Sequence, residues 1–303
     1  MIGRAVVGCG LIAGAAALYS QMGAADFSVE GKTVLVTGAA MGMGKIYAQK
    51  AVAEKAGRVV LWDVNEVGLQ KTAQELKDVG GNVQIQVVNV ADAKNVAEAA
   101  AATLKGGKVD VLFNNAGIVK GKRFWEHDNV RDTELTMKIN ALGPMYITHE
   151  FLPAMLESQS PCRIINVASA AGLNPNPNMT VYCASKAAAL NWSESLRIEL
   201  EQTGNDHVKV TTVCPSYIST GMFDGVKAPL LTPILTPEYV TGEVWTAMKS
   251  GRPLLLMPWT VHFSMMSRGV LPVRAFDFMC GKIFGVYNTM DQFKGRGPEP
   301  TKK

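Results

Sequence analysis

From residue 31 onward, short apolar runs alternate with longer segments in which apolar and polar residues recur at helical spacing. The apolar runs are rich in Val, Ile and Leu, as is typical of strands buried on both faces of a parallel sheet. The intervening segments repeat apolar residues with the period of a helix. The pattern therefore predicts an α/β fold built on a doubly wound parallel sheet.

The boundaries of these elements follow from the same pattern. The expected strands cover residues 32–38, 58–63, 83–90, 109–117, 162–169 and 208–215. The expected helices cover residues 45–56, 66–79, 93–105, 132–157 and 182–201. Pro144 lies inside the fourth of these helices and predicts a kink or a break there, because proline cannot donate the helical hydrogen bond.

The chain divides into three segments. Residues 1–30 form an apolar amino-terminal segment, residues 31–250 a single domain, and residues 251–303 an apolar and basic extension. With 303 residues, of which 48% are hydrophobic and 18% charged, the chain is expected to bury a full core. Residues 218–237 and 251–275 are rich in Pro, Met and Leu and are expected to form a lid over the carboxyl edge of the sheet.

The amino terminus carries no charge between Arg4 and Asp26. Such a run is long enough to span a bilayer, which takes about 20 residues, although its Ala and Gly content provides little transfer energy. Three interpretations remain open. We favour an uncleaved segment in or on a membrane with the domain facing the cytosol. The other two are an extension without a membrane role on a soluble cytoplasmic protein, or a misassigned start of translation, and a cleaved signal peptide.

The basic residues gather at the other end, where residues 251–303 hold eight Lys or Arg against three Asp or Glu. A basic, apolar tail suits contact with an anionic membrane surface, and a solvated tail packed on the domain fits equally well. No basic stripe is present, which argues against nucleic-acid binding. The five cysteines are odd in number and show no metal-ligand spacing, so we expect reduced thiols and no metal site.

A glycine-rich loop joins the first expected strand to the first expected helix. Its glycines are Gly38, Gly42 and Gly44, and Ala40, Met41 and Met43 stand between them. Glycines after a strand and before a helix let backbone N–H groups approach a pyrophosphate, which the amino end of the helix also favours. The loop therefore predicts a dinucleotide site.

Asp63 ends the second expected strand, where a carboxylate can accept hydrogen bonds from both hydroxyls of an adenosine ribose and would repel a 2′-phosphate. Position 41 in the glycine loop is Met, not the Arg or Lys that could pair with such a phosphate. Both features predict NAD rather than NADP.

Tyr182 and Lys186 stand four residues apart at the start of an expected helix and so share one face. A free phenol has a pKa of about 10, and a neighbouring ammonium together with an oxidised nicotinamide would stabilise the phenolate. Ser169 ends the preceding expected strand, where its hydroxyl can hold a substrate oxygen. The three residues predict general acid/base chemistry on an alcohol or carbonyl.

Residues 31–250 resemble the short-chain dehydrogenase/reductase family, a family of Rossmann-type domains. The resemblance rests on the glycine loop, Asp63, the run Asn114–Gly117, Asn140, Ser169, the motif from Tyr182 to Lys186, and residues 214–220. It implies that Tyr182 is the general acid/base, that Lys186 binds the nicotinamide ribose and tunes the phenol, and that Ser169 orients the substrate oxygen. It also implies that Asn140 holds a water that connects Lys186 to solvent. The cofactor contacts that it implies beyond the glycine loop are Asp63, Asn89, Val90, Asn115, Tyr182, Lys186, Pro215, Ile218 and Thr220.

Two positions depart from the family pattern. Ser216 follows Pro215 where glycine is usual, and Asn89 stands where an acidic residue is often found. The first leaves the local turn open, and the second leaves the adenine contacts open.

A finer resemblance is to the branch that holds 17-beta-hydroxysteroid dehydrogenase type 11-like enzymes and retinol dehydrogenases. It rests on residues 60–65, 151–155, 167–172, 235–238 and 290–296, and it implies a lipophilic alcohol or carbonyl as substrate. The apolar lid and the Met-rich tail suit such a ligand, although ordinary core packing or a dimer contact would explain them as well. A small polar or 3-oxoacyl substrate is the alternative within the enzymes, and a non-catalytic NAD-binding membrane scaffold is the alternative outside them. The family resemblance also implies a homodimer or homotetramer.

Overall fold

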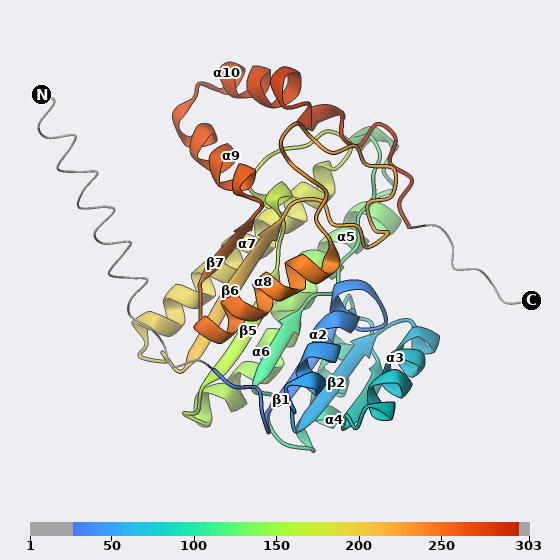
Figure 1. Cartoon of the computed structure of the whole chain (residues 1–303), viewed down its shortest axis with the longest axis vertical. Coiled ribbons are helices and arrows are strands. Elements are labelled where there is room, and N and C mark those ends of the chain that lie inside the picture. The colour runs from blue at the N-terminus through green and yellow to red at the C-terminus, as the bar shows by residue number, and fades with distance from the viewer. Residues whose placement is uncertain (1–26, 297–303) are drawn as a thin grey trace, which may run out of the picture.

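The computed structural model describes residues 27–296, so the expected amino-terminal anchor lies almost wholly outside the described residues. A single sheet of seven parallel strands forms the centre, in the order β3-β2-β1-β4-β5-β6-β7 (Figure 1). The strands are β1 (Thr33–Thr37), β2 (Arg58–Asp63), β3 (Val83–Val87), β4 (Val111–Asn114), β5 (Cys162–Val167), β6 (Val208–Pro215) and β7 (Leu254–Met257). The predicted Rossmann-type doubly wound fold is confirmed.

Helices cover both faces of this sheet. They are α2 (Gly42–Ala53), α3 (Glu66–Asp78) and α8 (Pro237–Ser250) on one face, and α4 (Ala93–Leu104), α6 (Gly143–Glu157) and α7 (Thr180–Gln202) on the other. Side chains alternate between the two cores along each strand, so that Val34 and Val36 face α2 while Leu35 faces the α4 and α6 side. Because both strand faces are buried, the apolar runs show no polar alternation.

The segment before α6 is helical but irregular. It passes through π-helical turns at Asn129–Glu134 and Lys138–Leu142 with the short α5 (Leu135–Met137) between them. Pro144 lies in the first turn of α6, where the missing N–H costs little. The kink or break expected at Pro144 is therefore a widened, π-helical turn just before this residue, and the helix continues beyond it.

Two elements of the sheet's far edge were not expected from the sequence. The structure adds α8 after the lid, and β7 pairs with β6. Leu254–Met257 therefore belong to the central sheet, although they lie within the segment 251–303 that the sequence suggested as an extension. Beyond β7 the chain leaves the sheet as α9 (Trp259–Val270) and α10 (Val273–Phe278), which stand apart from both helix layers in Figure 1.

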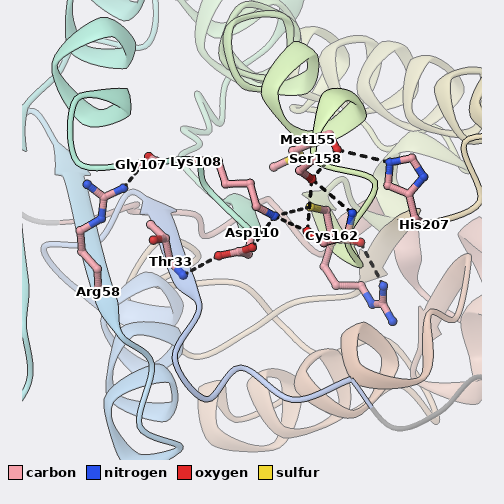
Figure 2. Close-up of polar contacts among 11 residues, drawn as sticks. Thr33, Arg58, Gly107, Lys108, Asp110, Met155, Ser158, Cys162 and His207 are labelled. Atoms are coloured by element: carbon pink, nitrogen blue, oxygen red, sulfur yellow. Dashed lines mark hydrogen bonds and ion pairs between the residues drawn. The ribbon is translucent and has the colours of Figure 1, made fainter.

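A polar network lies at the amino-terminal ends of the strands, which we call the amino edge of the sheet (Figure 2). Lys108 Nζ lies 2.7 Å from a carboxylate oxygen of Asp110, whose other oxygen accepts a 2.8 Å hydrogen bond from the backbone N–H of Thr33. The same ammonium donates to Ser160 Oγ at 2.6 Å and lies 3.6 Å from Cys162 Sγ. These contacts join β1, β4 and β5 at the end of the sheet opposite the glycine loop.

Candidate active site

Three connected hollows lie along the carboxyl ends of the strands. A cleft passes over the glycine loop, and a cavity lies under the lid and the tail. A passage joins them, because it shares Asn115 and Thr220 with the cleft and Ser169 and Tyr182 with the cavity. A molecule held in the cleft and another held in the cavity would meet at Tyr182.

The glycine loop follows β1 and leads directly into α2, which begins at Gly42, inside the loop rather than after it. Gly38 has φ +67° and Gly42 has φ +56°, conformations that side chains other than glycine rarely adopt. A methyl group on Gly44 would collide with the carbonyl oxygen of Gly38. The glycines therefore fix the turn and its close packing, and they leave the amino end of α2 open to the cleft.

Asn115 holds the loop from the side of β4. Its amide nitrogen donates to the carbonyl oxygen of Thr37 at 2.9 Å, and its backbone N–H donates to Thr37 Oγ1 at 3.0 Å. Its Oδ1 is buried and accepts no hydrogen bond within the described chain, although Asn115 lines the cleft. An open helix end, a glycine-rich loop without charged side chains and an unpaired acceptor fit a bound dinucleotide.

Asp63 lies at the end of β2 on the wall of the cleft. One carboxylate oxygen accepts the backbone N–H of Ala40 and the other that of Asn65, both at 3.0 Å. These two bonds orient the carboxylate toward the loop and leave it further acceptor capacity. A ribose in the cleft would therefore meet an oriented carboxylate.

The structure brings most of the predicted cofactor residues to these hollows. The cleft or the passage is lined by Gly38, Met41, Gly42, Met43, Asp63, Asn89, Val90, Asn115, Tyr182, Lys186, Pro215, Ile218 and Thr220. Ala40 and Gly44 line neither; the backbone of Ala40 bonds to Asp63 and Thr72, and Gly44 packs under the loop. Both support the loop from behind.

The cleft also contains residues that sequence reasoning missed. Met222 comes from the lid, and Arg296 comes from the tail and is the cleft's one basic lining residue within residues 27–296. Neither position carries a local signal, because each is brought to the cleft only by the fold of a distant segment. The family-like closing run at 290–296 was the nearest available indication.

Tyr182 lies in the first turns of α7, is 5% exposed, and lines the cavity and the passage together with Ser169. Burial raises the pKa of Tyr182 above its ordinary value, and the nearby Ser169 hydroxyl only partly opposes this. The cofactor-free chain therefore holds a neutral phenol, and the lowering of its pKa expected from the sequence needs a bound cofactor in addition to Lys186.

Lys186 lies one turn further along α7 and is 4% exposed. Its Nζ donates to the carbonyl oxygen of Val167 at 2.7 Å and lies 5.9 Å from the centre of the Tyr182 ring. Within residues 27–296 no carboxylate lies within ion-pair distance of it, and burial lowers the pKa of Lys186 to about 8. The ammonium is thus held close to the phenol without a counter-ion.

Asn140 lies in the π-helical turn Lys138–Leu142, packed against α7. Its Oδ1 accepts the backbone N–H of Ile118 at 2.9 Å, and its amide nitrogen donates to the carbonyl oxygen of Ile118 and to Ser185 Oγ. The side chain therefore fixes the loop after β4 against α7. The water expected between Asn140 and Lys186 stays a prediction.

The cavity under the lid is mainly apolar. Helix α9 and the segment after α10 form one wall, and the loop after β5 forms the other. Its apolar lining includes Met179, Phe223, Val261, Phe263, Met279, Phe284 and Val286. Phe223 packs edge-on against Tyr182, with ring centres 5.9 Å apart, so the apolar wall reaches the phenol itself.

Comparison with known proteins agrees with this geometry. The profile of the family described as short chain dehydrogenase matches residues 32–230. Short-chain dehydrogenase/reductase 3 from Homo sapiens is 35% identical over 88% of this chain and 87% of that protein. Epidermal retinol dehydrogenase 2 from Mus musculus is 33% identical over 89% and 87%. Estradiol 17-beta-dehydrogenase 11 from Pongo abelii is 32% identical over 84% of each.

Solved structures share the fold. A short chain dehydrogenase/reductase from Burkholderia phymatum in complex with NAD superposes with a TM-score of 0.73 and 27% identity, over 80% of this chain and 96% of that one. A short chain dehydrogenase from Burkholderia cenocepacia J2315 in complex with NADP gives 0.69 and 25%, over 83% and 98%. The fold, the glycine loop and the extent of these matches show one thing together: the chain belongs to the short-chain dehydrogenase/reductase family of oxidoreductases.

Proposed function

We propose that the protein interconverts a lipophilic alcohol and its carbonyl compound by NAD-dependent hydride transfer, with Tyr182 as the general acid/base. One observation carries this proposal: Tyr182 and Ser169 line both the apolar cavity and the passage to the cleft. An alcohol in the cavity and a dinucleotide in the cleft would come together beside these two hydroxyl groups, where Ser216 and Phe223 complete the wall that the cavity and the passage share.

In the oxidation direction Ser169 and Tyr182 hold the substrate oxygen, and Tyr182 removes its proton as hydride leaves the carbinol carbon. The bound dinucleotide supplies the hydride acceptor, or the donor in reduction. Held by the glycine loop, Asp63, Asn115 and Thr220, it would lie on the opposite side of the phenol from the cavity. The alcohol thus loses one proton and one hydride, which leaves the carbonyl.

Lys186 raises the acidity of the phenol. Its ammonium has no carboxylate partner in the described chain, so its field acts on Tyr182 without cancellation in a site from which water is largely removed. Asn140 positions the loop and helix around this lysine and, by resemblance, the water through which a proton would reach solvent.

NAD is the proposed cofactor because Asp63 directs a carboxylate at the ribose position and Met41 offers no cation. NADP is the second candidate, and Arg296 is the feature that favours it, since a guanidinium at the cleft could pair with a phosphate. Turnover with each cofactor, in the full chain and in Arg296→Gln, tests the choice. We expect NAD to be preferred in both proteins. A preference for NADP that disappears in Arg296→Gln would overturn the NAD proposal.

A lipophilic substrate is proposed because the cavity beside the phenol is lined mainly by apolar side chains. The names of the relatives, a retinol dehydrogenase and an estradiol dehydrogenase, agree with it. The test follows NADH formation with primary alcohols of increasing chain length. We expect kcat/KM to rise with length; no gain with length would favour a small polar substrate instead.

Two buried phenols give a matched control for catalysis. Tyr182→Phe is expected to abolish turnover with every alcohol, whereas Tyr47→Phe, which removes a fully buried hydroxyl outside the three hollows, is expected to keep it. Full turnover in Tyr182→Phe would contradict the role proposed for Tyr182, and a wild-type protein that binds NAD but oxidises no alcohol would point to a non-catalytic scaffold.

We also propose that α9 and α10 rest on a lipid surface. Between residues 27 and 296 no helix has the length and apolar content needed to cross a bilayer. The outer faces of α9 and α10 nevertheless expose large apolar side chains between exposed arginines and a lysine, while the inner face of α9 lines the cavity. The exposed apolar residues include Trp259, Met266, Val270, Val273 and Phe278, and the basic ones are Arg268, Arg274 and Lys282. Charge and apolarity together suit an anionic bilayer.

Sedimentation of the full chain with anionic vesicles tests this contact. Replacing Met266, Val270 and Val273 by Ser is expected to weaken it, and replacing the equally exposed Val67 and Val79 of the α3 region is the matched control. Equal binding of both variants would overturn the contact through α9 and α10.

A homodimer or homotetramer, expected from the family resemblance, is tested by light scattering of the purified chain; a monomer would contradict it.

A further inference from the structure

A small polar cluster interrupts the apolar wall of the cavity. Asn176 comes from the loop after β5, Tyr217 from the segment after β6, and Thr289 from the tail, and the first two line the cavity. The Asn176 amide nitrogen donates to Tyr217 Oη at 2.8 Å and to Thr289 Oγ1 at 3.1 Å. Tyr217 Oη and Thr289 Oγ1 are 2.7 Å apart, so each pair in the cluster is in contact.

The hydrogens of this cluster can be assigned one by one. Thr289 Oγ1 donates to the carbonyl oxygen of Val286 at 2.9 Å, so in its contact with Tyr217 it must accept. Tyr217 therefore donates to Thr289 and accepts from Asn176. Both amide hydrogens and both hydroxyl hydrogens then have acceptors, and the one group left over is Asn176 Oδ1, which is buried without a partner in the described chain.

The opposite orientation of the amide would be worse. Turning Asn176 over would direct its two N–H groups away from Tyr217 and Thr289 and leave two unpaired donors instead of one unpaired acceptor. Buried polar groups are strongly selected to be paired. The network therefore holds Asn176, which is 7% exposed, with its oxygen as the free group.

We propose that Asn176 Oδ1 accepts a hydrogen bond from a second polar group of the substrate, remote from the carbinol that reacts. The inference rests on the proposed function, which places the reacting carbinol at Tyr182 and Ser169 on the same cavity. The chemistry of an acceptor selects a donor: a hydroxyl or an N–H. A ketone or ether oxygen has no hydrogen to give, and it would set its lone pairs against those of the amide oxygen.

The substrate class that follows is a lipophilic alcohol with a distal hydroxyl or N–H group, not a hydroxy-ketone and not a plain hydrocarbon alcohol. The rest of the cavity lining is mainly apolar and suits the carbon skeleton between the two polar ends. A site that hydrogen-bonds a substrate hydroxyl discriminates against analogues that lack it, because its own polar group is then left unpaired.

Matched probes on two skeletons test the proposal. The linear set is dodecanediol, its monomethyl ether and dodecanol; the ring set is androstanediol, the corresponding hydroxy-ketone and androstanol. Binding to the cofactor-free full chain is measured by calorimetry, and kcat/KM by NADH formation. On the skeleton that binds more tightly, we expect the diol to bind about tenfold tighter than both other members of its set, as one hydrogen bond to a formerly unpaired buried group would give. Equal binding within both sets, or tighter binding of the ether or hydroxy-ketone, would overturn the proposal.

Substitutions then assign the preference to one side chain. Asn176→Leu is expected to remove it, whereas Asn176→Asp, which keeps an acceptor, is expected to retain it. Asn174→Leu is the comparison variant. Asn174 lines the same cavity from the same loop and its Oδ1 is likewise buried without a partner, but the residue is only half-buried and no side-chain hydrogen bond in the described chain fixes its amide, so it can present its nitrogen to a ligand as readily as its oxygen. A preference that survives Asn176→Leu, or that Asn174→Leu abolishes, would contradict the assignment to Asn176.

The two readouts separate this inference from the proposed function. If no alcohol were oxidised but the diol still bound about tenfold tighter, the proposed reaction would fail and the acceptor site would stand. If alcohols were oxidised without preference for a distal hydroxyl, the reaction would stand and the acceptor site would fail.

Discussion

A lysine lies beside buried polar groups at each end of the parallel strands, Lys108 at their amino-terminal ends and Lys186 at their carboxyl-terminal ends. The electrostatic surroundings of the two ammonium groups are opposite. At the amino-terminal ends of the strands Lys108 has a carboxylate partner, Asp110, and contacts Cys162 Sγ (Figure 2). It also donates a hydrogen bond to Ser160 Oγ. At the carboxyl edge Lys186 has a single backbone carbonyl, that of Val167, and is more deeply buried. One ammonium is neutralised by its surroundings and the other is not.

The pKa values follow this difference. Burial disfavours the charge of Lys108, but its hydrogen bond and attraction to Asp110 outweigh burial and raise its pKa. Burial alone decides at Lys186 and lowers its pKa to about 8. A lysine kept only for stability would gain from a partner such as Asp110. The missing partner at Lys186 therefore supports the proposal that its charge acts on another group, the phenol of Tyr182.

The largest expected effect is on turnover. Lys186→Met should lower kcat/KM for alcohol oxidation by about a thousandfold, within the usual range for loss of acid/base catalysis, because the phenol loses the charge that makes it acidic. Lys108→Met should change kcat/KM by less than about threefold, since it lies at the other edge of the sheet. Steady-state kinetics of the two variants, checked by circular dichroism for folding, would refute the comparison if the losses were equal.

The second effect separates cofactor binding from stability. Gly44→Ala places a methyl group against the Gly38 carbonyl and should weaken NAD binding by about tenfold or more, since a shift of the loop displaces its N–H groups. Gly57→Ala, at the amino edge, places one 2.6 Å from the carbonyl oxygen of Gly31 and should lower stability without changing NAD affinity in the folded protein. Calorimetric titration with NAD decides between these outcomes, and an equal loss of affinity in both variants would contradict the account.

The third effect reverses the order of the two lysines. Lys108→Met leaves Asp110 without its partner and should lower the free energy of unfolding by about 2–3 kcal/mol, somewhat less than for a fully buried pair because Lys108 is 28% exposed. Lys186→Met removes a buried charge without a partner and should leave stability unchanged or raise it. Urea unfolding at neutral pH measures both, and a larger loss in Lys186→Met would break the comparison.

The smallest effect is the dependence of stability on pH. The pKa of Lys186 is lower in the folded chain than in the unfolded one, so between pH 8 and about 10 the unfolded chain binds a proton that the folded chain lacks. Below pH 8 the buried charge of Lys186 lowers the free energy of unfolding. As the pH rises, this free energy should increase by roughly 2 kcal/mol between pH 7 and about pH 9.5. The cofactor-free wild type should show this gain relative to Lys186→Met. Parallel curves for the two proteins would mean that Lys186 is not titrating as proposed.

Sequence reasoning located the residues at the carboxyl-terminal ends of the strands better than it located the outermost strand, β7. Tyr182, Lys186 and Ser169 could be grouped in advance because each stands at a strand end or helix start, and parallel strands bring such ends together. The strand Leu254–Met257 could not, because four apolar residues between prolines look the same in a lid and in a sheet. Only pairing with β6 decides between them.

The contacts that the tail makes could not be predicted either. Arg296 in the cleft and Thr289 beside Asn176 depend on how a segment far along the chain folds back over the lid. The sequence also predicted an acidic Tyr182, but it could not show that burial first raises the pKa of this phenol, because burial is a property of the packed fold. In the proposed mechanism the acidity comes from the lysine together with the bound cofactor.

Spectroscopic titration of the Tyr182 phenol, with and without bound NAD, tests the central claim most directly, with Tyr182→Phe used to identify its signal. The account predicts a high pKa in the cofactor-free protein, a clear fall when oxidised NAD binds, and a much smaller fall in Lys186→Met. A phenol that titrates at the same pH in all of these states would contradict it.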